Sequence, residues 1–321
     1  MRVAGIDCGT NSIRLLIADV PGESGAPLRD IVRQMEVARL GQGVDRTGIF
    51  DPSALERALA FVEDYAAQCR EHAVESIRFA ATSATRDAAN RDIFLVGVRE
   101  RLGVAAQVLS GEQEARASFT GAVSSLPEGA DDPILTVDLG GGSTELVCGS
   151  RNGDIYAAVS MDVGCVRMRE RHLTSDPASE QQIAAARRDV QAALDAADID
   201  LSVPRTVIGL AGSITTITAK VLGLAAYDPA RIHGARLSVS DMDAACEWFI
   251  TSTAEQRAKL GFMHPGRVDV IQAGALVWQE VLRRICRDAG ADVITHTVTS
   301  EHDILDGLAL WAAREPNPPQ H

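Results

Sequence analysis

Two stretches of this 321-residue chain share one pattern, and their repetition constrains the fold more than any other feature of the sequence. In GIDCGTNS (residues 5–12) and VDLGGGST (residues 137–144), an apolar run ends near an aspartate, and glycines and small hydroxyl residues follow. The aligned pairs are Asp7 with Asp138, Gly9 with Gly140 and Ser12 with Ser143. Because apolar, strand-like residues flank both turns, the pattern predicts two duplicated α/β domains with mixed sheets and a cleft between them.

The elements expected around each turn support this duplication, because both halves open with three strands and continue with alternating helices and strands. The expected strands cover residues 2–20 and 134–150, each as a pair around its turn, and residues 31–40, 76–84, 105–109, 155–163, 204–213 and 291–300. The expected helices cover residues 53–69, 91–102, 111–123, 177–198, 214–224, 238–251, 268–286 and 303–315. We expect Asp51 to cap the first of these helices and Ser240 to cap the helix at 238–251.

A segment rich in proline, glycine and aspartate, residues 127–133, is the expected boundary between the two halves. The sequence therefore predicts a first domain at residues 1–126 and a second at residues 131–312. The last helix could pack back on the first domain, and residues 313–321 should form a loose tail.

Composition narrows the functional classes. The net charge of −13 argues against a broad nucleic-acid-binding surface but is compatible with a local site for an anionic substrate. No window reaches the roughly 18 continuous apolar residues that a membrane span needs. No signal-peptide pattern is found, so we expect a cytoplasmic protein. The six cysteines form no C-x-x-C pair, which favours buried free thiols over disulfides or a zinc site.

The two glycine turns are typical of phosphate binding. Glycine lets a ligand approach the backbone and tolerates positive φ, and consecutive N–H groups in a turn attract anions. A tight hairpin would explain one such turn, but two copies at matching positions favour an anion site. The candidate phosphate-binding residues are Gly9, Thr10, Asn11, Ser12, Gly140, Gly141, Gly142 and Ser143, and Thr144 adds a further donor.

The aspartates that precede these turns indicate a metal. A carboxylate about 4 Å from a phosphate charge costs roughly 4 kcal/mol at an effective dielectric of 20, so a cation should lie between them. Oxygen ligands and phosphate favour Mg²⁺, or Mn²⁺. Asp7 and Asp138 are the leading candidate ligands, and Glu145 is a weaker one that could instead face solvent.

A third loop, GLAGSITTITA at residues 209–219, leads from a strand into a helix. The free N–H groups at that helix N-terminus could bind another phosphate through Gly212 and Ser213. Capping of the helix by Ser213 alone is the alternative interpretation.

The sequence resembles the exopolyphosphatase/guanosine pentaphosphate phosphohydrolase (Ppx/GppA) family, in a short two-domain form, within the actin and sugar-kinase superfamily. The resemblance covers residues 1–312. It rests on the two turns with GLAGS and on four further blocks, which are ATSATRDAANRDIFL (81–95), VLSGEQEARASFTGAV (108–123), MDVGCVRMRE (161–170) and HPGRVDVIQAGALV (264–277). It implies ribonuclease H-like (actin-like ATPase) domains and Mg²⁺-dependent hydrolysis of a terminal phosphoanhydride in the cleft.

The resemblance also implies roles for particular residues. Glu114 would be the general base and Arg86 would hold phosphate, while Arg167 and Arg267 would line the substrate or form structural ion pairs. Gln113 stands where the family has a second acid, and the chain ends before the additional C-terminal helical region of longer members.

Several functions stay open on the sequence alone. The leading prediction is an exopolyphosphatase that acts on inorganic polyphosphate. The alternatives are a guanosine pentaphosphate 5′-phosphatase of the stringent response, a nucleotide-binding kinase or sensor, and an inactive homologue that binds guanosine tetraphosphate. Regulation by guanosine tetraphosphate and a homodimer are further expectations, and the apolar helix at 268–286 could be core or a dimer surface.

Overall fold

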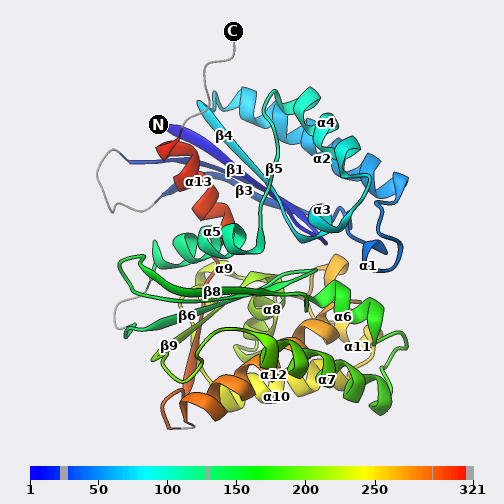
Figure 1. The fold of residues 1–321 in the computed structure, drawn as a ribbon, viewed down its shortest axis with the longest axis vertical. Coiled ribbons are helices and arrows are strands. Elements are labelled where there is room, and N and C mark those ends of the chain that lie inside the picture. The colour runs from blue at the N-terminus through cyan, green and yellow to red at the C-terminus, as the bar shows by residue number, and fades with distance from the viewer. Residues whose placement is uncertain (22–27, 127–129, 291, 316–321) are drawn as a thin grey trace. The chain divides into compact units, whose positions relative to one another are not determined.

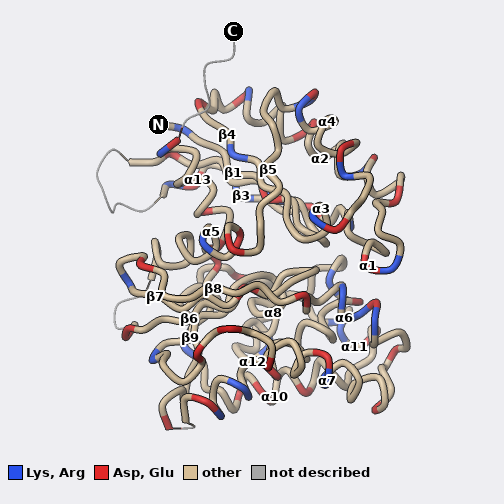
Figure 2. The backbone as a smooth tube through the Cα atoms, in the orientation of Figure 1, with Lys and Arg blue, Asp and Glu red and all other residues tan. Residues whose placement is uncertain are grey.

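The computed structural model of the chain describes residues 1–21, 28–126, 130–290 and 292–315 (Figure 1). The chain folds into two compact units. One comprises Met1–Ser125 with His302–His321, and the other comprises Leu126–Glu301. Each unit has its own sheet and its own hydrophobic core. Charged residues are spread over the helices and connecting segments of both units, so the net negative charge does not come from a single acidic segment (Figure 2).

The first unit is a five-stranded mixed sheet with helices on both faces. Its strands are β1 (Arg2–Cys8), β2 (Ile13–Asp19), β3 (Arg29–Glu36), β4 (Ser76–Ala81) and β5 (Gln107–Val108). The sheet order is β3-β2-β1-β4-β5, with β1, β2 and β3 antiparallel and β1, β4 and β5 parallel. Its helices are α1 (Val44–Thr47), α2 (Pro52–Glu71), α3 (Ser83–Asp87), α4 (Arg91–Leu102), α5 (Gly111–Val123) and α13 (Ile304–Arg314). The helices α2 and α4 cover one face, and α13 packs on the other (Figure 1).

The second unit is a six-stranded mixed sheet. Its strands are β6 (Ile134–Leu139), β7 (Thr144–Gly149), β8 (Ile155–Met161), β9 (Thr206–Leu210), β10 (Arg236–Ser238) and β11 (His296–Thr299), in the order β10-β11-β9-β6-β7-β8. Its helices are α6 (Cys165–Arg171), α7 (Glu180–Ala196), α8 (Ala211–Val221), α9 (Pro229–Ile232), α10 (Val239–Thr251), α11 (Ala254–Ala258) and α12 (Ile271–Ala289), with a 3₁₀ turn at Pro265–Arg267.

The two sheet orders confirm the predicted duplication and fold class. The run β3-β2-β1-β4-β5 corresponds strand by strand to β8-β7-β6-β9-β11, with the same antiparallel and parallel pairings. In both units the glycine turn joins the first two strands as a hairpin, and a parallel strand lies on the other side of the first strand. The predicted cleft between the halves stays a prediction.

The last helix belongs to the first unit. Its buried residues contact β1, β2 and β4, and it crosses α5 closely. A Cβ on Gly121 would lie 1.8 Å from the carbonyl oxygen of Asp303, and one on Gly307 would lie 1.9 Å from that of Ala117. The two glycines therefore permit this crossing. The predicted loose tail lies mostly outside the described residues, as does part of the predicted boundary segment.

The predicted helix caps and strand bounds are only partly confirmed. Asp51 caps α2 as predicted, accepting hydrogen bonds from the backbone N–H groups of Ser53 and Ala54. The predicted cap at Ser240 is wrong, because Ser238 accepts the N–H of Asp241 and the helix begins two residues earlier than Ser240 implies. The strand expected at 31–40 covers Arg29–Glu36, and the strand expected at 76–84 ends at Ala81, after which the short helix α3 begins at Ser83.

The apolar helix expected at 268–286 is α12, and its residues from Ile271 to Leu282 are all buried within this one chain. It is therefore a core helix, and the alternative of a dimer surface is wrong. All six cysteines are free, with five buried and Cys286 partly exposed, as predicted. Across the described ranges, no helix is both long and apolar enough to cross a membrane.

Candidate active site

The two glycine turns have the same backbone geometry. In the first turn, Gly9 N–H donates to the carbonyl oxygen of Ser12 at 3.0 Å, and in the second, Gly140 N–H donates to Ser143 at the same distance. None of the glycines in these turns adopts positive φ. Glycine at position 140 lets the two sides of the second turn pack closely, since a Cβ there would lie 3.1 Å from the carbonyl oxygen of Ser143.

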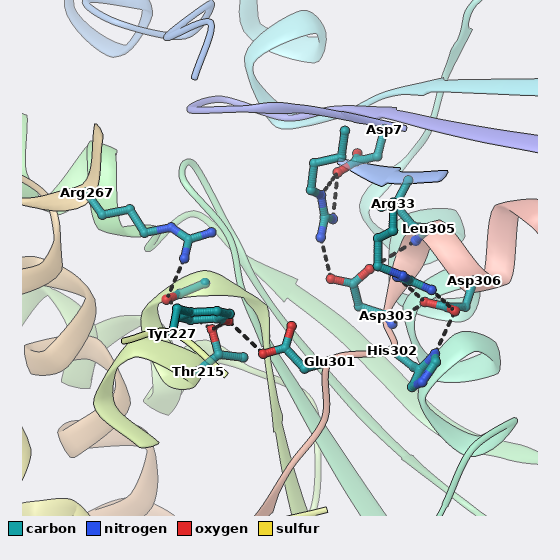
Figure 3. Close-up of polar contacts among 12 residues, drawn as sticks. Asp7, Arg33, Thr215, Tyr227, Arg267, Glu301, His302, Asp303, Leu305 and Asp306 are labelled. Carbon is teal, nitrogen blue, oxygen red and sulfur yellow. Dashed lines mark hydrogen bonds and ion pairs between the residues drawn. The ribbon is translucent and has the colours of Figure 1, made fainter. Parts of the chain in front are cut away.

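In the first unit, the aspartate before the turn is held by an arginine. Asp7 is buried on β1, and the register places Arg14 of β2 directly opposite. The Arg14 guanidinium donates to Asp7 Oδ2 at 2.7 and 3.0 Å and also pairs with Asp303, at the N-terminus of α13 (Figure 3). Burial raises the pKa of Asp7, and Arg14 opposes that shift. Arg14 therefore compensates two buried carboxylates at once.

In the second unit, the equivalent pair consists of two acids. Asp138 of β6 lies opposite Glu145 of β7 in the register, so both side chains are on the same face of the sheet. Asp138 is 8% exposed and Glu145 only 1% exposed, and Ser160 donates a hydrogen bond to Glu145 Oε1 at 2.7 Å. The alternative that Glu145 faces solvent is wrong. Two acids opposite each other favour a cation nearby.

The first residues of α6 donate hydrogen bonds to the second turn. The N–H groups of Cys165 and Val166 donate to the carbonyl oxygens of Gly140 and Gly141 at 3.0 and 2.8 Å. Arg167 is buried, and its Nε donates to the Gly142 carbonyl oxygen at 2.7 Å. Its guanidinium also lies 3.7 Å from Asp162. Arg167 therefore makes structural contacts, which was one of its two interpretations from the sequence.

The candidate base and the candidate phosphate-binding arginine meet in the first unit. The strands β1, β4 and β5 are parallel, so the first turn, α3 and α5 follow their carboxyl ends at one edge of the sheet. Arg86 of α3 donates to Glu114 Oε2 of α5 at 2.7 Å and to the Leu109 carbonyl oxygen at 2.9 Å. Glu114 is 9% exposed. This ion pair fixes the orientation of the carboxylate.

Gln113, which replaces an acid of the family pattern, has a local structural role. The Ser110 side chain accepts the Gln113 N–H at 3.2 Å, and the Gln113 side chain accepts the Ser110 N–H at 2.9 Å. This is a capping box at the start of α5. Glutamate would serve equally well in that motif, so the replacement keeps the helix start that positions Glu114.

The third loop begins α8, and its contacts differ from the expectation. Leu210 is the N-cap without a side-chain hydrogen bond, so the interpretation of Ser213 as the cap is wrong. Arg267 lies over Gly212: a Cβ there would be 2.2 Å from the guanidinium carbon, so a side chain at position 212 would displace the guanidinium. Nearby, the Tyr227 hydroxyl lies 2.6 Å from Glu301 Oε1, which accepts its proton, and 2.7 Å from the Thr215 hydroxyl (Figure 3).

The structure thus groups the predicted residues by unit. The first unit holds the first turn, Arg86 and Glu114, and the second holds the second turn, Asp138, Glu145 and the α8 loop. Sequence reasoning missed Arg14 and Asp303. Arg14 could have been found, because it stands seven positions after Asp7, as Glu145 stands seven after Asp138. Within the described residues, no group of three or more His, Cys, Asp or Glu could hold a metal alone.

Two duplicated sheets of this order, each with a glycine turn after its first strand, define the actin-like ATPase fold. Residues 16–311 match the Ppx/GppA phosphatase family, and the chain belongs to it. Exopolyphosphatase 2 of Mycobacterium tuberculosis (strain H37Rv) is 47% identical over 97% of this chain and 98% of its own length.

Two further relatives extend the comparison. The crystal structure of an exopolyphosphatase-like protein has a TM-score of 0.93 at 44% identity, covering 98% of this chain and 99% of that one. Guanosine-5'-triphosphate,3'-diphosphate pyrophosphatase of Pseudoalteromonas atlantica is 35% identical over 60% of this chain and 37% of its own length. The relatives therefore include a protein named as an exopolyphosphatase and one named as a guanosine-5'-triphosphate,3'-diphosphate pyrophosphatase.

Proposed function

We propose that this protein is an exopolyphosphatase, which hydrolyses the terminal phosphoanhydride of inorganic polyphosphate and releases orthophosphate. The observation that carries the proposal is the buried Glu114 carboxylate, 2.7 Å from the Arg86 guanidinium at the sheet edge that carries the first glycine turn. The 47% identity to a protein named Exopolyphosphatase 2, over nearly the full length of both chains, supports the choice of substrate.

Glu114 is proposed as the general base. A carboxylate that is mostly buried and held by one cation can accept a proton from water as the water attacks the terminal phosphorus. The bond from that phosphorus to the bridging oxygen then breaks, and the shortened polyphosphate leaves. Arg86 pairs with Glu114 and has further N–H groups that can bind a phosphate oxygen.

The two glycine turns are proposed to bind phosphate oxygens through their N–H groups, together with the hydroxyls of Thr10, Ser12 and Ser143. The buried Thr10 hydroxyl supports this assignment, because no hydrogen-bond partner is found for it among the described residues. Gly212 and Ser213 keep their proposed role at the start of α8. Arg267 lies against Gly212 and would bring a cation to the same loop.

The second hairpin fits a divalent metal better than the first. Asp138 and Glu145 are both buried and face each other across two strands, whereas Asp7 already pairs with Arg14. We therefore propose that Asp138 and Glu145 hold Mg²⁺, or Mn²⁺, with substrate oxygens and water, and that Asp7 has mainly an organising role. The bound metal would neutralise charge on the phosphate oxygens.

Guanosine pentaphosphate is the second candidate substrate, because it ends in the same phosphoanhydride. The relative from Pseudoalteromonas atlantica, named a guanosine-5'-triphosphate,3'-diphosphate pyrophosphatase, supports it. Control by guanosine tetraphosphate and a homodimer belong to the same family-based proposal. Since α12 is a core helix, a dimer would have to use another surface.

The test is phosphate release from polyphosphates of several chain lengths and from guanosine pentaphosphate, with Mg²⁺ and with water as the sole acceptor. Release from polyphosphate is expected. If phosphate is released from guanosine pentaphosphate alone, guanosine pentaphosphate replaces polyphosphate as the proposed substrate. No release from either would favour a kinase, a sensor or an inactive homologue, which binding of adenosine and guanosine nucleotides would then distinguish.

A further inference from the structure

Arg39 has an unusual backbone conformation directly beside the first glycine turn. Its φ is +52°, in the left-handed region that few residues other than glycine adopt. Its N–H donates to the carbonyl oxygen of Asn11 at 2.8 Å, and the Gly41 N–H donates to that of Thr10, also at 2.8 Å. The segment from Arg39 to Gly41 therefore runs along the turn and is fastened to two consecutive residues of it.

Gly41 packs closely against this turn. A Cβ on Gly41 would lie 2.3 Å from Thr10 Cγ2 and 2.8 Å from the Cβ of Ala84 in α3. Two buried hydroxyls, Thr10 Oγ1 and Thr85 Oγ1, belong to these neighbouring segments, and neither has a hydrogen-bond partner among the described residues. Buried hydroxyls normally find partners, so this pair indicates that a polar ligand completes the site.

The residue type at position 39 is what needs explaining. Glycine or asparagine would adopt the left-handed conformation at lower cost, and the hydrogen bond to Asn11 uses only the backbone. Arginine therefore costs more backbone free energy at this position than glycine would. The Arg39 side chain is partly exposed, and its backbone N–H is bonded to Asn11 of the first glycine turn.

We propose that Arg39 binds a phosphoryl group behind the terminal one, so that it contributes to substrate affinity and not to the chemical step. This inference rests on the proposed function. A polyphosphate chain carries a negative charge on every phosphoryl group. Because the protein has a net charge of −13, local cations are needed where the polyphosphate chain binds. Arginine suits this role, because its planar fork binds phosphate oxygens through two hydrogen bonds.

The test uses Arg39→Gly, which removes the guanidinium and relieves the backbone strain. Ala73→Gly is the matched control, because exposed Ala73 also has a φ of +52° in the same unit. Arg46→Gln controls for net charge, since Arg46 is exposed on α1. Steady-state kinetics on polyphosphate, inhibition by orthophosphate and thermal unfolding are measured for the four proteins, wild type included.

The expected result is that Arg39→Gly raises KM for polyphosphate roughly 10–100-fold and changes kcat less than about twofold, since a charged hydrogen bond is lost without loss of the catalytic base. Its stability should be unchanged or higher, its inhibition by orthophosphate unchanged, and both controls unchanged. Arg39→Lys should recover part of the affinity and so exclude a purely structural effect.

Other outcomes overturn the proposal in distinct ways. An unchanged KM in Arg39→Gly removes Arg39 from the substrate path while the proposed function stands. A weaker inhibition by orthophosphate, equal to the rise in KM, would move Arg39 to the terminal phosphoryl group. If the wild-type protein hydrolyses neither substrate, the proposed function fails. Arg39 is then tested by polyphosphate binding in a filter assay, where equal affinity of wild type and Arg39→Gly overturns it.

Discussion

The β1–β2 and β6–β7 hairpins have one backbone and two different charge patterns. Both turns are closed by the same hydrogen bond, and both place an aspartate opposite the residue seven positions later. In the first hairpin that residue is Arg14, which pairs with Asp7, whereas in the second it is Glu145, which adds a second acid to Asp138. The two hairpins therefore share a backbone geometry and differ in the charge of one side chain, which is Arg14 in the first and Glu145 in the second.

This difference suggests a division of roles. In the first unit each described acid of the site has an arginine, Asp7 with Arg14 and Glu114 with Arg86. In the second unit two buried acids face each other, which suits a divalent cation. We therefore expect the two hairpins to respond differently when their charged side chains are replaced. The following predictions test that comparison in order of decreasing effect.

Removing the base should have the largest effect. Glu114→Gln should reduce turnover roughly 10²–10⁴-fold, because the amide cannot accept the proton of the attacking water. Phosphate release measures this. The matched control is Glu112→Gln, which removes an exposed carboxylate of the same helix turn that pairs with Arg116, and which should leave turnover unchanged. Full activity in Glu114→Gln would show that the first unit does not supply the base.

Removing the cation of the first hairpin should destabilise the protein. Arg14→Met leaves the buried carboxylates of Asp7 and Asp303 without their shared guanidinium, which should lower the free energy of unfolding by about 3–5 kcal/mol. Urea denaturation measures the change. Arg29→Met is the control: the Arg29 side chain is 75% exposed beside Asp19, and its loss should cost less than about 1 kcal/mol. Equal effects would mean that the buried pair is no more important than a surface one.

The two hairpins should differ in metal dependence. Glu145→Gln should raise the Mg²⁺ concentration for half-maximal activity by about tenfold or more, because it removes a candidate ligand from the acidic pair. Asp7→Asn should leave that concentration unchanged whatever it does to turnover, since Arg14 already compensates Asp7. Mg²⁺ titrations of activity decide this. A shift caused by Asp7→Asn and absent in Glu145→Gln would reverse the assignment.

The smallest predicted effect concerns α13, the last helix of the described chain. Asp306 accepts hydrogen bonds from Arg33 and lies 2.7 Å from His302 (Figure 3). Burial would raise the pKa of Asp306, but the hydrogen bonds of His302 and Arg33 outweigh it and lower the pKa to about 2. For His302, burial acts to lower the pKa, but Asp306 outweighs it and raises the pKa above its ordinary value of 6.5.

These shifts set the sign of the pH dependence. The His302 contribution is complete below pH 6.5 and is lost as the pH rises through its raised pKa. The Asp306 contribution is complete above its ordinary pKa of 3.8 and is lost as the pH falls towards 2. The melting temperature should therefore fall modestly between pH 6 and 8, and His302→Gln should remove that slope. His296→Gln, at an exposed position, should keep it. An unchanged slope in His302→Gln would exclude this contact as its source.

Much of the fold could be predicted from the sequence because it depends on local patterns. The paired strands around each glycine turn, the cap at Asp51 and the buried cysteines follow from apolar periodicity, side-chain chemistry and composition. The cap at Ser240 could not be settled in this way, because Ser238 and Ser240 both offer a hydroxyl near the helix start. The choice between them depends on where β10 ends, and that is set by its pairing with β11.

The sequence by itself determined the duplication, the two turns and the candidate residues Glu114, Arg86, Asp138 and Glu145, because repeated patterns and side-chain types are visible along the chain. Only the tertiary structure decided which of these groups meet. Arg14 lies opposite Asp7 through strand register, and Asp303 reaches the same guanidinium because α13 returns to the first unit. The Arg14–Asp303 contact joins residues 289 positions apart, and its energy depends on burial and distance, which no local pattern encodes.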